Sequence, residues 1–210
     1  MTENPNYHYP YNHYIFVYAC LMPVLKKILV EIKNPNKKQY VLDIGCGSGG
    51  FCNFLHSLSF EVVGLDNSMS GIDIARTNLP NIRFYNNSIY DFDEPDLYGK
   101  FDIVTSMGVI EHLTNPRELL RQAKRYLNPN GYFLVATQYH GYLKNLILSA
   151  LNLWDWHFSV DWDTGHVKFF SVKSLKNLLK AQGFTNLKFF FSGRCPCLWK
   201  DMICLCQPSL

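Results

Sequence analysis

The chain has 210 residues and a formal net charge of +3, so its length predicts one domain and its charge gives no indication of nucleic-acid binding. No stretch approaches about 20 uninterrupted apolar residues and no secretory leader is recognisable, so we expect a cytoplasmic protein without a transmembrane segment. The seven cysteines are odd in number, which favours reduced thiols over a disulfide framework.

The N-terminal part of the chain, residues 1–35, is predicted to contain one helix. Apolar side chains recur at helical spacing from Tyr14 to Ile32, with a bend expected near Pro23. This helix either packs on a sheet or folds over a ligand as a lid, and we expect the lid. The Tyr-rich residues 7–14 are a second lid candidate, with disorder in the absence of a ligand as the alternative.

Short strands and helices alternate over residues 36–140. Strands are predicted at 41–44, 60–66, 82–85, 101–106 and 132–136, the last after a turn at 128–131. Helices are predicted from Phe51, over 69–78 and over 116–127. Asn115, Pro116 and Glu118 supply the N-cap, the first helical proline and the capping-box acid of the last of these helices. This alternation predicts a parallel, doubly wound α/β sheet.

A strongly apolar segment follows the alternation. Residues 141–156 predict an inserted helix, and several Trp and Phe side chains interleave with aspartates up to residue 170. Three interpretations remain open. The segment covers an aromatic or lipid-tailed ligand, rests at a membrane interface, or completes the core.

The C-terminal part predicts one helix and two strands. Ser171 caps a helix over 172–182, which Gly183 ends. The strands at 184–191 and 200–206 are close enough in sequence to form an antiparallel hairpin. The chain contains no internal repeat and no linker between domains.

Two Cys-x-Cys pairs lie near this hairpin, Cys195 with Cys197 and Cys204 with Cys206. Paired cysteines can ligate zinc, although structural zinc sites more often space them by two to four residues. We therefore expect core cysteines and no metal site.

The most informative motif is a glycine turn between the first strand and the helix that begins at Phe51. Its glycines are Gly45, Gly47, Gly49 and Gly50. A turn without side chains, placed between a strand and a helix N-terminus, lets a ligand approach the backbone N–H groups closely. A simple tight turn is the alternative, which the flanking strand and helix disfavour.

The spacing of this turn fits two cofactors. Gly45, Gly47 and Gly50 satisfy the dinucleotide pattern, and an acid at the end of the next strand, Asp66, suits the ribose of either cofactor. Asp43 separates the two interpretations, because a carboxylate just before the turn would repel a pyrophosphate. It would attract S-adenosylmethionine (SAM), which carries a sulfonium and an ammonium group.

The chain resembles the class I SAM-dependent methyltransferases, particularly the small-molecule branch that includes ubiquinone-biosynthesis O-methyltransferase-like proteins. The resemblance covers about residues 40–190 and is carried by Asp66 and the segments 41–49, 101–104, 109–113, 127–131 and 165–171. It implies a Rossmann-like sheet of seven strands in the order 3-2-1-4-5-7-6, with strand 7 antiparallel and helices on both faces. It also implies a single domain divided into a SAM-binding core (36–140), a substrate cover (141–170) and a C-terminal helix and hairpin (171–210).

The resemblance also implies residue roles toward SAM. Asp43 and the turn backbone would hold the methionine end, Asp66 the ribose hydroxyls, and Asn67 with Met69 would flank the adenine. Ser88 stands where the family usually has an acid at the adenine amino group. The full set of expected cofactor contacts is Asp43, Gly45, Cys46, Gly47, Gly49, Phe51, Asp66, Asn67, Met69, Ser88, Ile89, Met107 and Gly108.

Methyl transfer to a hydroxyl needs an aligned acceptor and a group that takes the proton. Glu111 and His112 follow the fourth strand and His166 lies in the cover, so these three are the catalytic candidates. His140, at the tip of the fifth strand, is a fourth. The alternative roles are structural: Glu111 fixes the loop backbone, His112 packs over the cofactor, and His166 tethers the cover to the sheet.

The resemblance thus implies transfer of a methyl group from SAM to a small molecule, with S-adenosylhomocysteine as the second product. The expected acceptor atom is an oxygen of a phenol, a quinone precursor or a sugar. An NAD(P)-dependent oxidoreductase and a non-catalytic SAM-binding module are the two alternatives. Peripheral contact with a membrane stays open.

Overall fold

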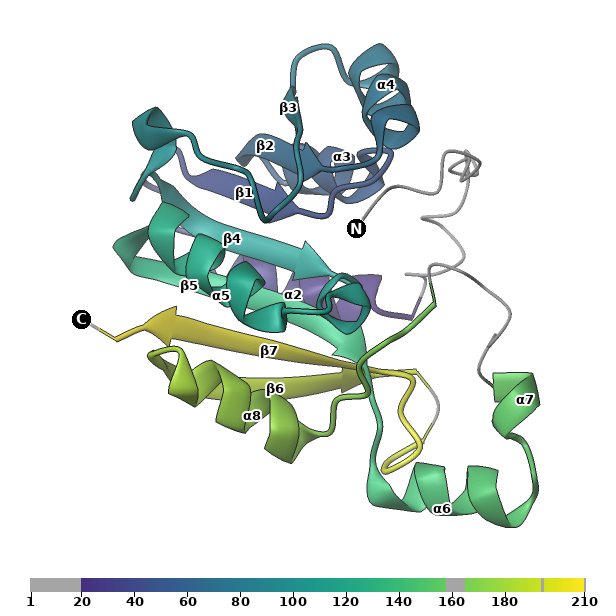
Figure 1. Cartoon of the computed structure of the whole chain (residues 1–210). Helices are drawn as coiled ribbons and strands as arrows, with labels where there is room; N and C mark the ends of the chain where they lie inside the picture. The colour runs from purple at the N-terminus through teal and green to yellow at the C-terminus, as the bar shows by residue number, and fades with distance from the viewer. Residues whose placement is uncertain (1–19, 158–164, 194, 210) are drawn as a thin grey trace.

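The computed structural model describes residues 20–157, 165–193 and 195–209, and its centre is a seven-stranded sheet (Figure 1). The strand order is β3-β2-β1-β4-β5-β7-β6, and β7 runs antiparallel to both of its neighbours, as predicted. The strands are β1 Tyr40–Ile44, β2 Glu61–Asp66, β3 Arg83–Asn86, β4 Phe101–Met107, β5 Leu127–Gln138, β6 Phe184–Ser192 and β7 Asp201–Pro208.

Helices cover both faces of this sheet. The covering helices are α2 Met22–Ile32, α3 Gly50–Ser57, α4 Met69–Asn78, α5 Pro116–Tyr126 and α8 Val172–Ala181. Two further helices, α6 Tyr142–Ala150 and α7 Trp154–His157, follow β5, and the short 3-10 turns are η1 Pro95–Leu97 and η2 Ile110–His112. None of the described helices is long and apolar enough to cross a membrane.

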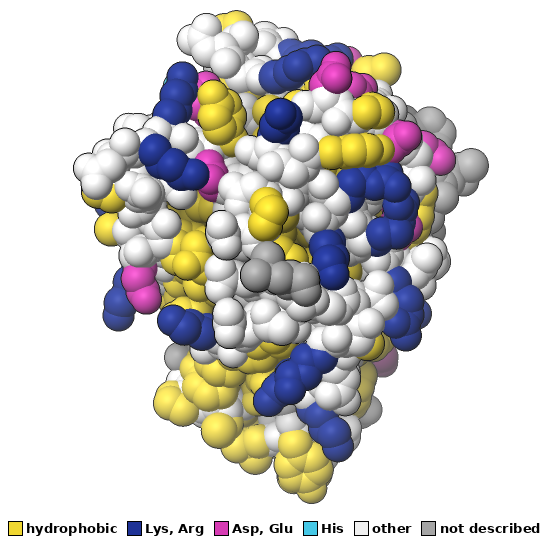
Figure 2. Space-filling view, turned by 90° about the vertical axis from the view of Figure 1, so that its left-hand side faces the viewer, with side chains coloured by type: hydrophobic (Ala, Val, Ile, Leu, Met, Phe, Trp, Pro, Cys, Tyr) yellow, Lys and Arg dark blue, Asp and Glu magenta, His cyan; other side chains and the backbone are white. Residues whose placement is uncertain are grey.

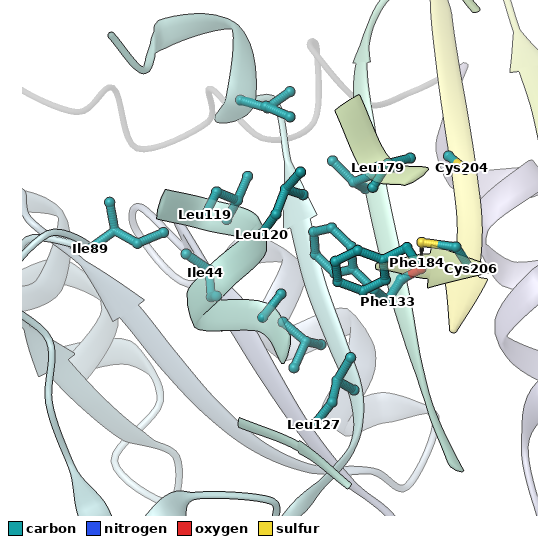
Figure 3. Close-up of a cluster of buried hydrophobic side chains, with 14 of the residues drawn as sticks. Ile44, Ile89, Leu119, Leu120, Leu127, Phe133, Leu179, Phe184, Cys204 and Cys206 are labelled. Carbon is teal, nitrogen blue, oxygen red and sulfur yellow. Dashed lines mark hydrogen bonds between the residues drawn. The ribbon is translucent and has the colours of Figure 1, made fainter. Parts of the chain in front are cut away.

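Two clusters of buried apolar side chains lie on opposite faces of the sheet. Val41 of β1 belongs to the cluster under α2, α3 and α4, whereas Leu42 and Ile44 belong to the cluster under α5 and α8, because successive residues of a strand face opposite sides. Burial on both faces explains why these strands read as continuous apolar runs. Figure 3 shows the second cluster, in which Leu119, Leu120 and Leu179 from the helices meet Phe133 and Phe184 from the strands.

The predicted N-terminal helix differs from expectation in its described part. α2 begins at Met22 with Pro23 in its first turn, where a fixed φ and a missing N–H are tolerated, so the proline starts the helix instead of bending it. Leu25, Ile28 and Leu29 of α2 are buried in the core. This helix therefore packs on the sheet and is not a lid; residues 1–19, with the second lid candidate, lie outside the described residues.

Three local predictions also need correction. The predicted capping box of α5 does not form, because the Asn115 side chain makes no cap hydrogen bond and Glu118 pairs with Arg121 instead. The predicted turn at 128–131 belongs to β5, whose pairing with β4 shifts register there. The inserted helix is two helices, α6 and α7, because the chain turns at 151–153.

The C-terminal predictions are confirmed, apart from one cysteine pair. Ser171 caps α8, in a capping box with Ser174, and Gly183 follows the helix in a left-handed conformation with φ +77°. The seven cysteines are all free. Cys204 and Cys206 are buried as expected, but the expectation of core positions is wrong for Cys195 and Cys197, which are exposed in the loop between β6 and β7.

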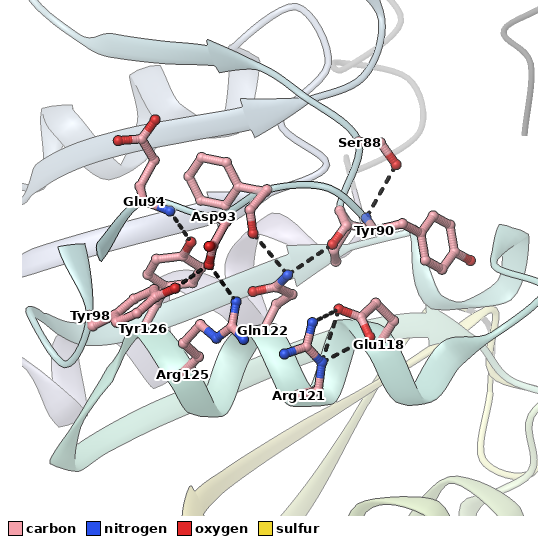
Figure 4. A network of polar contacts seen from close by, with 12 residues as sticks. Ser88, Tyr90, Asp93, Glu94, Tyr98, Glu118, Arg121, Gln122, Arg125 and Tyr126 are labelled. Atoms are coloured by element: carbon pink, nitrogen blue, oxygen red, sulfur yellow. Dashed lines mark hydrogen bonds and ion pairs between the residues drawn. The ribbon is translucent and has the colours of Figure 1, made fainter. Parts of the chain in front are cut away.

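A buried amide on α5 fixes the loop that follows β3. The Gln122 side chain is 1% exposed, and its Nε2 donates to the carbonyls of Ile89 at 3.1 Å and Phe92 at 3.0 Å (Figure 4). On the same helix Arg121 pairs with Glu118 at the exposed surface. The hydrogen bonds of Gln122 therefore position Ile89, one of the predicted cofactor contacts, whereas the Arg121–Glu118 pair is exposed to solvent.

We expect Gln122→Leu to lower the free energy of unfolding by about 1–3 kcal/mol, because two buried carbonyls would lose their donor. The matched control is Arg121→Ala, one residue away, for which we expect less than about 1 kcal/mol because the pair is exposed. Urea denaturation of both variants measures the difference. Equal losses would show that Gln122 does not hold the loop.

Candidate functional site

The glycine turn lies at the end of β1 and packs against the loop that follows β4. Gly45 has φ +82°, and a Cβ atom added to it would lie 2.1 Å from Cγ2 of Val109. Gly49 has φ +81° and precedes α3 directly. Only glycine allows both the left-handed backbone and this contact, so the turn and the start of the β4 loop form one surface.

Asp66, at the end of β2, joins the turn to helix α4. Its Oδ2 accepts a hydrogen bond of 2.8 Å from Gly47 N, and its Oδ1 accepts one of 2.8 Å from Ser68 N. Ser68 in turn caps α4 by accepting from Gly71 N. The predicted ribose-binding carboxylate therefore also orders the backbone on two sides of the expected cofactor.

Asp43 is buried beneath the turn, with its side chain directed into the protein. Thr105 donates to its Oδ1 at 2.7 Å, and the Cys52 thiol lies 3.4 Å from its Oδ2. Burial raises the pKa of Asp43 to about 6, although the hydrogen bonds from Thr105 and Cys52 oppose that shift and the charge of Asp66 adds to it. Two carboxylates thus lie at one turn, and a nearby cation would stabilise their ionised forms.

The other predicted cofactor residues lie at the same edge of the sheet, with different exposure. Asn67 and Met69 are exposed, whereas Ile89 and Met107 are buried. Gly108 follows β4 with φ +69°, and its N–H donates to the carbonyl of Ala136 in β5.

Three further predicted residues already have partners within the protein. The Ser88 hydroxyl accepts from Tyr90 N in its own turn. Cys46 is buried and offers its backbone N–H to Leu65 O. Phe51 lies in the core beside Phe54, with ring centroids 5.8 Å apart.

The three predicted catalytic residues form one cluster beside this turn. Glu111 and His112 lie in η2, and the carbonyl of Glu111 accepts from Val167 N and Lys168 N, both at 2.9 Å. This pairing places His166 against His112, with ring centroids 4.8 Å apart. His112 Nδ1 lies 3.3 Å from the carbonyl of Gly165. One possible ligand atom from each of the three side chains lies within 4.8 Å of the others.

The charge states of this cluster suit proton transfer. Burial raises the pKa of Glu111 to about 7, and its Oε2 has no hydrogen-bond partner among the residues that the structure describes. Burial, with help from the charge of His112, lowers the pKa of His166 to about 4, so this imidazole is neutral near pH 7. A neutral imidazole beside a carboxyl that titrates near neutrality can accept a proton. The same three side chains could also hold a divalent cation. The sequence had raised a metal held by Glu111, His112 and another group only as a minor alternative, because the spacing of these residues is not typical of a metal site.

His140 is separate from these three. Its backbone N–H donates to Phe170 O, and its ring packs edge-on against Phe169 with centroids 5.1 Å apart. Burial lowers the pKa of His140 to about 4, and the charge of Lys144 contributes. His140 therefore lies next to the start of α6, and the charge of His166 also contributes to lowering its pKa.

The sequence reasoning missed Thr105, Cys52 and Lys144. The first of these had a usable signal: strands 1 and 4 are neighbours in the predicted order, and the register places Asp43 opposite Thr105. For Cys52 the sequence predicted only a place in the helix that begins at Phe51, and no contact with Asp43. The role of Lys144 had no signal in the sequence: the residue is buried, and its Nζ donates to the carbonyl of Tyr139, in the segment between β5 and α6.

Comparison with known proteins agrees with this geometry. A family model described as a methyltransferase domain matches residues 11–188. The chain is 36% identical over 98 residues to a ubiquinone biosynthesis O-methyltransferase of Bradyrhizobium diazoefficiens, covering 46% of this chain and 39% of the relative. A protein with the same name from Rickettsia akari is 28% identical over 118 residues, covering 54% of this chain and 46% of the relative. The chain thus matches less than half the length of these relatives.

Solved structures share the fold at low sequence identity. The PH0226 protein of Pyrococcus horikoshii OT3 superposes with a TM-score of 0.70 and 21% identity over 93% of this chain and 91% of its own. A SAM-dependent methyltransferase of Mesorhizobium loti gives a TM-score of 0.65 and 17% identity over 86% and 96%. With the family model matching most of its length, the chain belongs to the methyltransferase-domain family and has the Rossmann-like fold of the SAM-dependent methyltransferases.

Proposed function

We propose that the protein transfers a methyl group from SAM to an oxygen atom of a small molecule, a phenol, a quinone precursor or a sugar. The observation that carries this proposal is the contact between Gly45 and Val109. It joins a turn with two acidic side chains to the loop that carries Glu111 and His112. A cationic donor and a proton-accepting cluster would then lie side by side.

The chemistry divides between these two parts. The acceptor oxygen forms a bond to the SAM methyl carbon as the bond from that carbon to sulfur breaks, which leaves S-adenosylhomocysteine. The hydroxyl proton passes to the cluster, where His166 or the ionised Glu111 takes it. Asp43 and Asp66 would bind and orient the donor, and residues 141–170 would cover the acceptor.

The two relatives reported above support transfer to oxygen by name, since both are called ubiquinone biosynthesis O-methyltransferases. The match spans less than half of their length, so the acceptor of this chain is part of the proposal. An NAD(P)-dependent oxidoreductase fits less well, because a pyrophosphate at the glycine turn would approach the carboxylate of Asp43.

Calorimetry shows which of the two cofactors, SAM or NAD, the protein binds. The pH dependence of SAM affinity tests the role of Asp43. Because its pKa is about 6, we expect SAM affinity to fall by about tenfold from about pH 7 to pH 5, as the carboxylate protonates. Asp43→Asn should bind SAM more weakly and lose this difference. Binding of NAD in place of SAM would refute the proposal.

The Asp43 carboxyl also predicts an effect on thermal stability, opposite in sign to its effect on SAM affinity. Its folded pKa lies above the model-peptide value of 3.8, so ionised Asp43 destabilises the ligand-free fold, and this cost grows as pH rises through about 6. Asp43→Asn should therefore unfold at a higher temperature than the parent near pH 7, with little difference near pH 4. A lower melting temperature near pH 7 would show that the carboxylate stabilises the fold.

Asp66→Asn should weaken SAM by about 1–3 kcal/mol, the scale for losing hydrogen bonds to a charged group. Asp73→Asn, on the exposed side of α4, is the matched control and should leave SAM affinity unchanged. Unchanged affinity in Asp66→Asn would remove this residue from the cofactor site.

His166→Ala and Glu111→Gln should each lower kcat by about 10²–10⁴-fold with SAM affinity kept, because they remove proton acceptors and not cofactor contacts. His56→Ala, in the last turn of α3, is the control. Single-turnover rates over a panel of phenols and sugars measure the loss. Weaker SAM binding with normal turnover would instead place His166 against the cofactor.

A further inference from the structure

Five of the ten exposed large apolar side chains among the described residues lie on one segment, the arm formed by α6 and α7. Tyr142 is 82% exposed and Leu151 is 63% exposed. We use the term arm patch for the exposed residues Tyr142, Leu143, Leu146, Leu151 and Trp154. Contiguous exposed apolar surface of this kind marks an interaction site in a soluble protein.

The arm patch is not a helix face that packs on the core, because α6 directs its charged residue into the protein and several apolar residues outward. Lys144 is its one charged residue, yet it is 3% exposed and its Nζ donates to Tyr139 O at 2.9 Å. Leu148, one turn further along, is buried on the same face, whereas the apolar residues Tyr142, Leu143 and Leu146 face outward. A helix that packs on a core has the reverse arrangement. This inversion leaves the outward face of α6 without charge.

The arm projects from the body of the molecule. Figure 1 shows α6 and α7 beyond the end of β5, away from the helices that cover the sheet. In the space-filling view the lower end of the molecule, where α6 lies, is largely apolar and is bordered by Lys and Arg side chains (Figure 2). The patch therefore forms a projecting surface with basic neighbours, and not a groove.

We propose that the arm patch docks on the surface of an anionic lipid bilayer. Tyr142 and Trp154 lie near the two ends of the arm, and Trp and Tyr are the residues enriched at membrane–water interfaces. Lys168 and the exposed Lys173 follow in sequence beside the exposed Val167 and Phe169 and supply charge complementary to anionic headgroups, whereas Asp155 is the only acid in the described part of the arm.

The arm patch continues toward the candidate site. Phe169, which is exposed, packs on the ring of His140, and the Val167 backbone N–H donates to the carbonyl of Glu111. Docking would therefore bring the catalytic cluster close to the bilayer surface. An acceptor with a lipid tail could then reach the cluster without leaving the membrane, a consequence that rests on the proposed methyl transfer.

Co-sedimentation of the full chain with vesicles tests the docking surface. We expect binding to vesicles of phosphatidylcholine mixed with phosphatidylglycerol, and weaker binding to phosphatidylcholine alone. The double variant Leu143→Gln/Leu146→Gln should lose about tenfold or more in partitioning, because two apolar side chains no longer enter the interface. Lys168→Glu should lower binding to the anionic vesicles only. Val30→Gln, which changes an exposed residue of α2, is the matched control and should bind as the parent does.

Two results would overturn the docking proposal. One is a failure of the vesicle test: the parent protein stays in solution with anionic vesicles, or the double variant sediments with them as well as the parent does. The other is a concentration-dependent dimer in sedimentation velocity that the double variant abolishes, which would make a second copy the partner. Melting temperature and SAM affinity, measured on every variant, show that the fold and the cofactor site are intact. If the parent protein does not bind SAM, the methyl-transfer proposal is refuted, whereas the vesicle result still holds.

Discussion

The hydrogen bond from Thr105 to the buried carboxylate of Asp43 is the interaction on which the candidate cofactor site depends. It links neighbouring strands β1 and β4 at the edge where the glycine turn begins. Burying a carboxylate is costly unless it gains partners, and here the partners leave its charge close to the turn. The fold thus maintains an electronegative position that a bound cation would stabilise.

A second constraint joins this position to the catalytic candidates. The β4 loop contacts Gly45 through Val109, and two residues later Glu111 accepts backbone hydrogen bonds from the 167–168 segment. The segments at 111 and at 167–168, far apart in the sequence, are therefore held together by backbone hydrogen bonds that do not depend on which side chains line the site. Such an arrangement allows the acceptor side to vary while the donor side is retained, in keeping with the general separation of fold and function.

Much of the fold could be predicted because its signals are local. The glycine turn, the capped helix at Ser171 and the continuous apolar strands each follow from short-range chemistry. The errors lie where other contacts replace those that the local pattern predicts. Asn115 and Glu118 form a capping pattern in the sequence, but Glu118 pairs with Arg121. The 128–131 segment has turn residues, but strand pairing with β4 recruits it.

The site was predictable to a similar degree. Motif order brought Glu111, His112 and His166 together as candidates, and they do cluster, although their roles stay predictions. The inverted orientation of α6 could not be predicted, because a single lysine in an apolar helix is expected to face water. Its burial depends on the carbonyl of Tyr139, which no sequence pattern reveals.

The position of β7 has a consequence for biosynthesis. This strand follows β5 and β6 in the chain, yet it lies between them in the sheet. Until residues 201–208 have been made, β5 has no neighbour on the side that β7 will occupy, so the nascent chain carries an open strand edge. Completion of the sheet, and of the core around Cys204 and Cys206, must therefore wait until translation has passed this strand.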